Sequence, residues 1–151
     1  MRRNFLKLFS ASLFSFLLMP YKFLYSATKK IINQNLTDEQ KNILFNEGTE
    51  RPFSSSLLHE KRDGFYHCAN CEAKLFSSNS KYDSGTGWPS FYKSLPDVFE
   101  TKTDHLLGYA RTEYHCKNCN AHHGHIFDDG PQPTGKRYCN NGVCLVFKEV
   151  K

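Results

Sequence analysis

The chain has 151 residues and a formal net charge of +5 at pH 7. A chain of this length fits one domain with a single hydrophobic core. The positive charge is concentrated at the N-terminus, because residues 1–30 hold six of the 20 basic residues and no acidic residue. The remainder has 14 basic and 15 acidic residues, so it lacks the basic surface with which proteins bind nucleic-acid phosphates. We therefore expect no nucleic-acid partner.

The N-terminal segment has the layout of an export signal. A basic start that contains Arg2 and Arg3 precedes an apolar run at residues 8–19, and small residues follow at Ser26 and Ala27. The paired arginines also resemble a twin-arginine signal of bacteria. The apolar run is short for a hydrocarbon core of about 30 Å, so an N-terminal membrane anchor is the alternative. We expect a protein exported to the bacterial periplasm or cell envelope, with an export signal at 1–27, a linker at 28–35 and one domain at 36–151.

A short helix is expected after the linker. Thr37 and Gln40 form a capping-box pattern, which marks the start of a helix. Ile43 and Leu44 supply its apolar side, and Gly48 lies where the helix should end.

From about Phe65 onward, short segments rich in Tyr, Phe, Val and Thr alternate with turn-forming clusters such as DSGTGWP and DDGPQPTG. This alternation predicts antiparallel β-structure with functional loops.

Two C-x-x-C knuckles occur in matching contexts, YHCANC at residues 66–71 and YHCKNC at residues 114–119. Two such knuckles can present four thiolates at the corners of a tetrahedron, which is the geometry of a structural zinc site. We expect one structural Zn²⁺ bound by Cys68, Cys71, Cys116 and Cys119. Disulfides within each pair, or a thioredoxin-like redox pair, are the alternatives. His67 and His115 should point away from the metal, because each directly precedes a ligand.

Cys139, in the segment RYCNN, is a candidate nucleophile. If residues 137–141 form a strand, alternation places Arg137, Cys139 and Asn141 on one face. A nearby guanidinium favours the thiolate, which is the reactive form. A buried free cysteine beside a surface arginine explains the same pattern, and this segment alone leaves both interpretations open.

The segment AHHGHIFDD at residues 121–129 packs three histidines and two acids together. Histidine can protonate an oxygen leaving group near neutral pH, and a carboxylate can fix its tautomer. A second metal site that uses His122 and His125 is an alternative, as is a solvated histidine-rich loop.

The only tryptophan, Trp88, follows Gly85 and Gly87 and precedes Pro89. Such a loop can present an aromatic wall to a ligand. A lone tryptophan in the core is the alternative.

Together these motifs closely resemble the B-type peptide-methionine (R)-S-oxide reductases. The resemblance runs from about Leu36 to Phe147. It rests on GTE with the following PF, both C-x-x-C pairs, SGTGWPSF, RTE at 111–113, AHHGHIFDDGP with PTG, and RYCNN. It implies a mainly β domain with two antiparallel sheets, the β-tent-like fold of methionine sulfoxide reductase B, with short flanking helices and a structural zinc site away from the chemistry.

The resemblance also implies roles for individual residues. Cys139 matches the nucleophile, and Trp88 matches the aromatic residue that packs against the S-methyl group of the substrate. His122 and His125 match the histidines that bind or protonate the sulfoxide oxygen. The surrounding polar groups are matched by Asp129, Arg137 and Asn141. In the implied reaction, the Cys139 thiolate attacks the sulfoxide sulfur, methionine leaves, and Cys139 becomes a sulfenic acid.

The chain departs from many members at Thr86, where they carry a resolving cysteine. In an extended strand, Cys144 would lie roughly 16 Å from Cys139 and on the opposite face, beyond the reach of about 7 Å for a disulfide. We therefore expect a buried structural Cys144. His123 and Asn140 also replace residues that are often apolar in the family.

The expected partners are oxidised proteins or peptides as substrates and a thioredoxin-like or other thiol reductant. We expect a monomer. A zinc-ribbon-like binding module and a thiol-disulfide oxidoreductase are the alternative functions, although the charge distribution disfavours the first.

Overall fold

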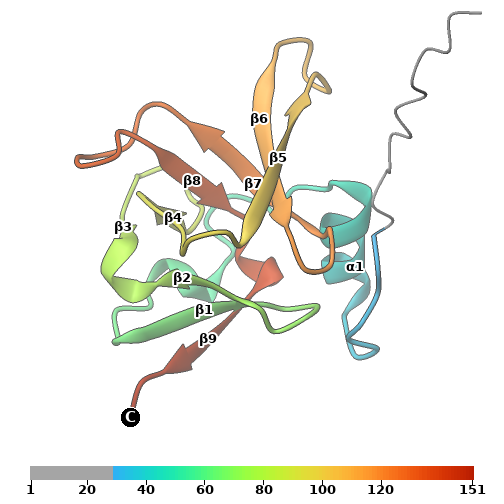
Figure 1. The fold of residues 1–151 in the computed structure, drawn as a ribbon, viewed down its shortest axis with the longest axis horizontal. Helices are drawn as coiled ribbons and strands as arrows, with labels where there is room; N and C mark the ends of the chain where they lie inside the picture. Colours follow the sequence, from blue (N-terminus) through green and yellow to red (C-terminus); the bar gives the residue numbers. More distant parts are fainter. Residues whose placement is uncertain (1–28) are drawn as a thin grey trace, which may run out of the picture.

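The computed structural model describes residues 29–151, which form two antiparallel sheets and short helices (Figure 1). The predicted export signal at 1–27 lies outside the described residues. Among residues 29–151, no helix has both the length and the apolar character needed to cross a membrane.

The smaller sheet contains three strands and the larger sheet contains six (Figure 1). The smaller sheet has the order β2-β1-β9 and consists of β1 (Gly64–Cys68), β2 (Lys74–Ser77) and β9 (Leu145–Glu149). The larger sheet has the order β3-β4-β8-β7-β6-β5 and consists of β3 (Lys81–Tyr82), β4 (Ser90–Phe91), β5 (Phe99–Asp104), β6 (Arg111–Cys116), β7 (His122–Phe127) and β8 (Arg137–Asn140). Every pairing is antiparallel, which confirms the predicted fold class.

Aromatic side chains join the two sheets. Tyr66 and Phe76 come from the smaller sheet, Phe91 and Tyr114 come from the larger one, and all four are fully buried. The rings of Phe76 and Phe91 stack with centroids 4.1 Å apart, and Tyr66 packs edge-on against Phe91 at 4.9 Å. These large buried rings pack across the two sheets, so they hold both sheets in one core.

The predicted helix is present as α1 (Asp38–Asn46), and its capping box forms between Thr37 and Gln40. Ile43 and Leu44 are buried, as expected from their position on the apolar side. The helix ends at Asn46, and the C-cap residue Glu47, with a left-handed φ of 60°, closes the last turn just before Gly48. The other helical segments are three 3₁₀ turns, η1 (Ser56–Leu58), η2 (Ser78–Ser80) and η3 (Gly142–Cys144).

Strand β8 lies between β4 and β7, and this position brings distant motifs together. Cys139 is directly opposite Ser90 on one side and His125 on the other. Gly124 allows the close approach of β7 to β8, because a Cβ atom there would lie 1.9 Å from the carbonyl oxygen of Cys139. The sheet register thus places the predicted nucleophile next to one of the predicted histidines.

Candidate functional site

The two C-x-x-C knuckles have the same backbone geometry. In the first, the N–H of Glu72 donates to the carbonyl of Cys68 at 2.9 Å, and in the second the N–H of Asn120 donates to the carbonyl of Cys116 at 2.7 Å. Glu72 and Asn120 both adopt left-handed φ values, 61° and 58°. The sequence repeat therefore corresponds to a repeated turn that closes after each cysteine pair.

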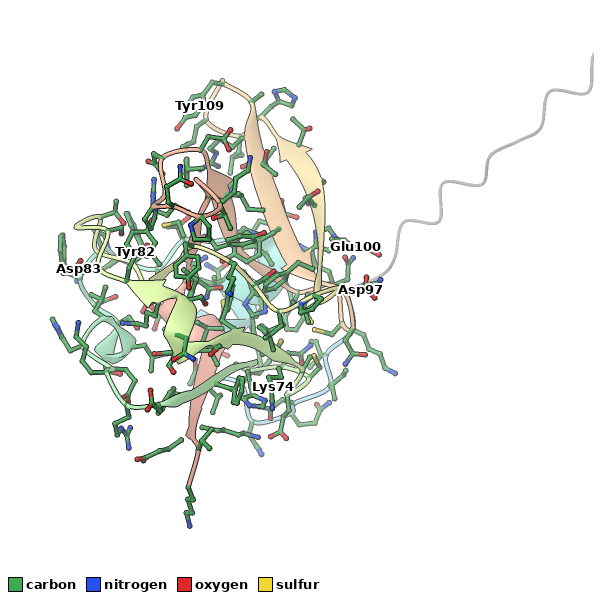
Figure 2. All side chains as sticks on the ribbon, turned by 60° about the vertical axis from the view of Figure 1, so that its left-hand side comes forward. Lys74, Tyr82, Asp83, Asp97, Glu100 and Tyr109 are labelled. Carbon is green, nitrogen blue, oxygen red and sulfur yellow. The ribbon has the colours of Figure 1, made fainter. Side chains whose placement is uncertain are left out.

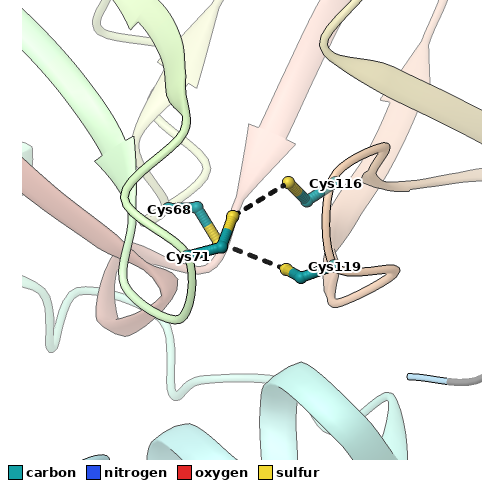
Figure 3. Close-up of side chains that lie close together, drawn as sticks. All are labelled: Cys68, Cys71, Cys116 and Cys119. Atoms are coloured by element: carbon teal, nitrogen blue, oxygen red, sulfur yellow. Dashed lines mark hydrogen bonds between the residues drawn. The ribbon is translucent and has the colours of Figure 1, made fainter. Parts of the chain in front are cut away.

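The two knuckles face each other, so that their four sulfur atoms converge (Figure 3). The Sγ atoms lie within 4.8 Å of one another, with 3.8 Å between Cys68 and Cys119 and 3.6 Å between Cys71 and Cys116. Four sulfurs bound tetrahedrally at ~2.3 Å would be about 3.8 Å apart, so this cluster fits a zinc ion. In the described part of the chain, it is the one group of three or more His, Cys, Asp or Glu side chains arranged to hold a metal.

The histidines near the cluster make other contacts. His67 Nδ1 lies 2.9 Å from the carbonyl oxygen of Glu72, and His115 lies 3.7 Å from Glu100, so neither joins the metal-ligand cluster. His123 is fully buried, and its Nε2 lies 3.4 Å from the Sγ of Cys68. This residue, noted in the sequence only as a departure from the family, therefore touches a ligand of the candidate metal site.

A pocket opens beside β8 on the larger sheet. It combines a thiol, an indole, an imidazole and amide groups. Its lining residues are Thr49, Trp88, Arg111, Gly124, His125, Phe127, Cys139, Asn140 and Asn141. Four of the seven predicted catalytic and substrate-binding residues thus share one pocket, namely Trp88, His125, Cys139 and Asn141.

The thiol of Cys139 is partly buried, and burial raises its pKa above the ordinary value for cysteine. The Arg137 guanidinium and a hydrogen bond from the Thr86 hydroxyl act in the opposite direction. Arg137 therefore favours the thiolate, as predicted, but burial outweighs it. Thr86 belongs to a hydroxyl network in which Ser84 Oγ lies 2.8 Å from both Thr86 Oγ1 and Ser90 Oγ.

His125 is held by a carboxylate that sequence reasoning missed. Its Nε2 lies 2.8 Å from Oδ2 of Asp104, and the same oxygen accepts a hydrogen bond from Arg111. Burial lowers the pKa of His125, while the hydrogen bond to Asp104 opposes this shift. A carboxylate in this position stabilises the imidazolium and fixes the ring orientation.

His122 lies behind the pocket instead of lining it. It is almost fully buried, and its Nδ1 lies 2.8 Å from Oε1 of Glu113, a residue with only 1% exposure. The rings of His122 and His125 are in edge contact, with centroids 5.5 Å apart. His122 can therefore influence His125 through direct ring contact, with Glu113 as its own partner.

Arg137 and Asp129 form a two-point ion pair next to the pocket. The Nε and Nη2 atoms of Arg137 each lie 2.8 Å from a carboxylate oxygen of Asp129, and the guanidinium stacks 4.3 Å from the centre of the Phe127 ring. Neither charged residue lines the pocket, whereas Phe127 does. The pair thus supports the pocket wall and places a cation near Cys139.

Asn141 and Trp88 both form hydrogen bonds with the main chain of Glu50. Trp88 Nε1 donates to the carbonyl of Glu50 at 2.9 Å, and the N–H of Glu50 donates to Oδ1 of Asn141 at 2.9 Å. Asn141 Nδ2 donates to the carbonyl of His123 at 3.1 Å. Asn141 lies after the end of β8, so its position does not follow from strand alternation, and both ends of its amide bind the protein main chain.

The extended path predicted from Cys139 to Cys144 is wrong. Residues 142–144 form the 3₁₀ turn η3, because the N–H of Cys144 donates to the carbonyl of Asn141 at 3.1 Å. Cys144 is fully buried, as predicted, and burial raises the pKa of its thiol well above the ordinary value. These features favour an unreactive, structural cysteine.

The SelR domain family matches residues 36–149. A peptide methionine sulfoxide reductase MsrB of Shigella dysenteriae serotype 1 is 51% identical over 119 residues, which cover 78% of this chain and 87% of that protein. The same protein of Escherichia coli O45:K1 is also 51% identical, and that of E. coli strain K12 / DH10B is 50% identical, with the same coverage.

The extent and specificity of these matches agree with the mainly β fold and with the two cysteine knuckles. The identity greatly exceeds what a shared fold alone requires, and it covers nearly all of the described residues. The chain therefore belongs to the SelR-domain family of methionine sulfoxide reductases of the B type.

Proposed function

We propose that this protein reduces R-configured methionine sulfoxide in proteins and peptides, with Cys139 as the nucleophile. The observation that carries the proposal is that Cys139, Trp88 and His125 line one pocket, with Cys139 directly opposite His125 on the neighbouring strand. This reaction needs three groups, namely a sulfur nucleophile, an aromatic surface for the S-methyl group and a proton donor.

In the first step, the sulfur of Cys139 attacks the sulfoxide sulfur and the S–O bond breaks. His125 protonates the oxygen as that bond weakens, so the oxygen leaves the substrate as a hydroxyl group that ends on Cys139. The thiol and the sulfoxide thus become a sulfenic acid and a thioether, and two electrons pass from Cys139 to the methionine sulfur. Asp104 holds His125 in place for this proton transfer.

The raised pKa of Cys139 bears on how the thiolate is formed. The thiol must lose its proton as attack begins, and the Arg137 guanidinium and the Thr86 hydroxyl are the groups that favour the resulting negative charge. Asn141 lines the pocket, but we assign it mainly to positioning, because its amide joins Glu50 to His123.

We propose that an external thiol or a thioredoxin-like protein regenerates Cys139. Thr86 offers no thiol, and Cys144 is fully buried in η3. One reductant thiol displaces water from the sulfenic acid to give a mixed disulfide with Cys139. A second reductant thiol then releases Cys139 and leaves as part of a disulfide, so the electrons balance.

A single-turnover experiment tests this chemistry. Without reductant, the protein should form one equivalent of methionine and one sulfenic acid, which dimedone traps on Cys139. A stoichiometric disulfide between Cys139 and Cys144 would overturn the proposed route of regeneration. Absence of methionine would overturn the proposed nucleophilic reduction itself.

We propose that the four-cysteine site holds a structural Zn²⁺. Its ligands come from both sheets, because Cys68 ends β1 and Cys116 ends β6. Bound zinc supplies cross-linking and no open coordination position for chemistry. Measurement of one zinc per chain, lost together with folding when a ligand is removed, would support this assignment.

We also propose that the enzyme acts in the bacterial periplasm or cell envelope. The support is the basic and apolar pattern of residues 1–27. Fractionation of cells that express the full chain tests this location, and recovery of the protein only in the cytoplasm would contradict it.

A further inference from the structure

The loop between β5 and β6, residues 105–110, exposes large apolar side chains. We call this loop the hairpin tip. Leu106 is 76% exposed, Leu107 is 58% exposed and Tyr109 is 57% exposed. Figure 2 shows Tyr109 at the outer end of the hairpin, away from the core. Three large apolar side chains in four consecutive positions form an exposed patch of the kind that marks binding surfaces.

Both ends of the hairpin tip connect to residues that line the pocket. Oδ1 of Asp104 accepts a hydrogen bond from the N–H of Leu106 at 2.7 Å, while Oδ2 of the same carboxylate lies 2.8 Å from His125. At the other end of the tip, Arg111 lines the pocket. The carboxylate of Asp104 therefore links the main chain of the hairpin tip to His125, the proposed proton donor.

The tip is also ordered by its own hydrogen bonds. The N–H of Gly108 donates to the carbonyl of His105 at 2.9 Å, and Gly108 adopts a φ of 81° that favours glycine. The ion pair between Asp104 and Arg111 closes the base of the hairpin, where the two residues are directly opposite. A surface that is already ordered loses less conformational entropy on binding.

A polypeptide substrate must place residues outside the pocket. The pocket has room for the oxidised side chain beside Cys139, so the neighbouring substrate residues lie across the rim. Methionine is a core residue, and its oxidation places a polar group where apolar packing is required. A segment that opens for this reason exposes apolar neighbours together with the sulfoxide.

We propose that the hairpin tip binds apolar side chains that flank methionine sulfoxide in an unfolded or locally opened polypeptide. This inference rests on the proposed reductase function and specifies its preferred substrate. The tip supplies apolar contact area, and the adjoining pocket supplies the chemistry. Recognition by the tip is thus an addition to binding of the sulfoxide itself.

The test compares three substrates in the full chain and in a Leu106→Ser, Leu107→Ser double variant. The substrates are a peptide with leucines flanking the sulfoxide, the same peptide with serines flanking it, and N-acetyl methionine sulfoxide. For the leucine-flanked peptide, kcat/KM should fall about tenfold, because contact with two leucines is lost. For the other two substrates, kcat/KM of the double variant should stay within about twofold of the wild-type value.

Val146→Ser is the matched control, because Val146 is 43% exposed on β9 in the other sheet. This variant should leave all three rates unchanged. Equal rates for the wild-type and double-variant chains on the leucine-flanked peptide would overturn the proposal, as would an equal loss on all three substrates. Inactivity of the wild-type chain on all three substrates would instead overturn the reductase function, so the two failures are distinguishable.

Discussion

Replacement of Asn141 by alanine tests whether this residue positions the site or mainly contacts substrate. The side chain is 4% exposed and joins the N–H of Glu50 to the carbonyl of His123. Asn141→Ala leaves the N–H of Glu50 buried without this partner, whereas the carbonyl of His123 keeps the hydrogen bond from the main-chain N–H of residue 141, so we expect the free energy of unfolding to fall by about 1–3 kcal/mol. Chemical denaturation of the zinc-loaded chain measures this change.

The same substitution should reduce activity by displacing Trp88, whose indole binds the carbonyl of Glu50. We expect KM to rise for every sulfoxide substrate, because the contact proposed for Trp88 is with the S-methyl group that all of them share. Asn46→Ala on the exposed side of α1 is the matched control and should change stability by less than about 0.5 kcal/mol. An Asn141→Ala protein with wild-type stability and reduced activity would refute the positioning role and favour direct substrate contact.

Three further predictions concern the metal, the packing of the strands and the proton donor. Cys116→Ser should abolish stoichiometric zinc binding and lower the thermal midpoint, as measured by metal analysis and calorimetry, since zinc binding contributes to folding. Gly124→Ala should destabilise the fold by about 1–3 kcal/mol in chemical denaturation, because the added methyl would overlap the carbonyl of Cys139. Asp104→Asn should lower the pKa of His125, so the loss of kcat/KM at high pH should begin at lower pH; an unchanged pH profile would contradict this role of Asp104.

Local patterns in the sequence predicted the features that depend on nearby residues. The capping box at Thr37 formed because both of its partners lie within one turn of helix. The four cysteines could be grouped because each C-x-x-C knuckle is a self-contained turn, and only their mutual approach depends on the fold. Cys139 and Trp88 could be assigned to one site because the family resemblance supplied the long-range information that spacing lacks.

Contacts between side chains on different strands could not be predicted from local sequence patterns. Asp104 meets His125 only because β5 and β7 flank β6, and Glu113 meets His122 only because β6 and β7 are paired. The RTE motif contained Glu113, but no spacing rule connects it to a buried imidazole. Likewise, the turn η3 ends the alternation of β8 and redirects the chain after Asn140.

Cys139 is the proposed nucleophile of a stereospecific reduction. The most direct measurement is the reduction of separated R and S methionine sulfoxide epimers by the zinc-loaded wild-type protein and by Cys139→Ser. We predict that the wild type reduces only the R epimer and that the variant reduces neither, while zinc content and folding are unchanged. Reduction of the R epimer by the folded Cys139→Ser protein would contradict the central claim.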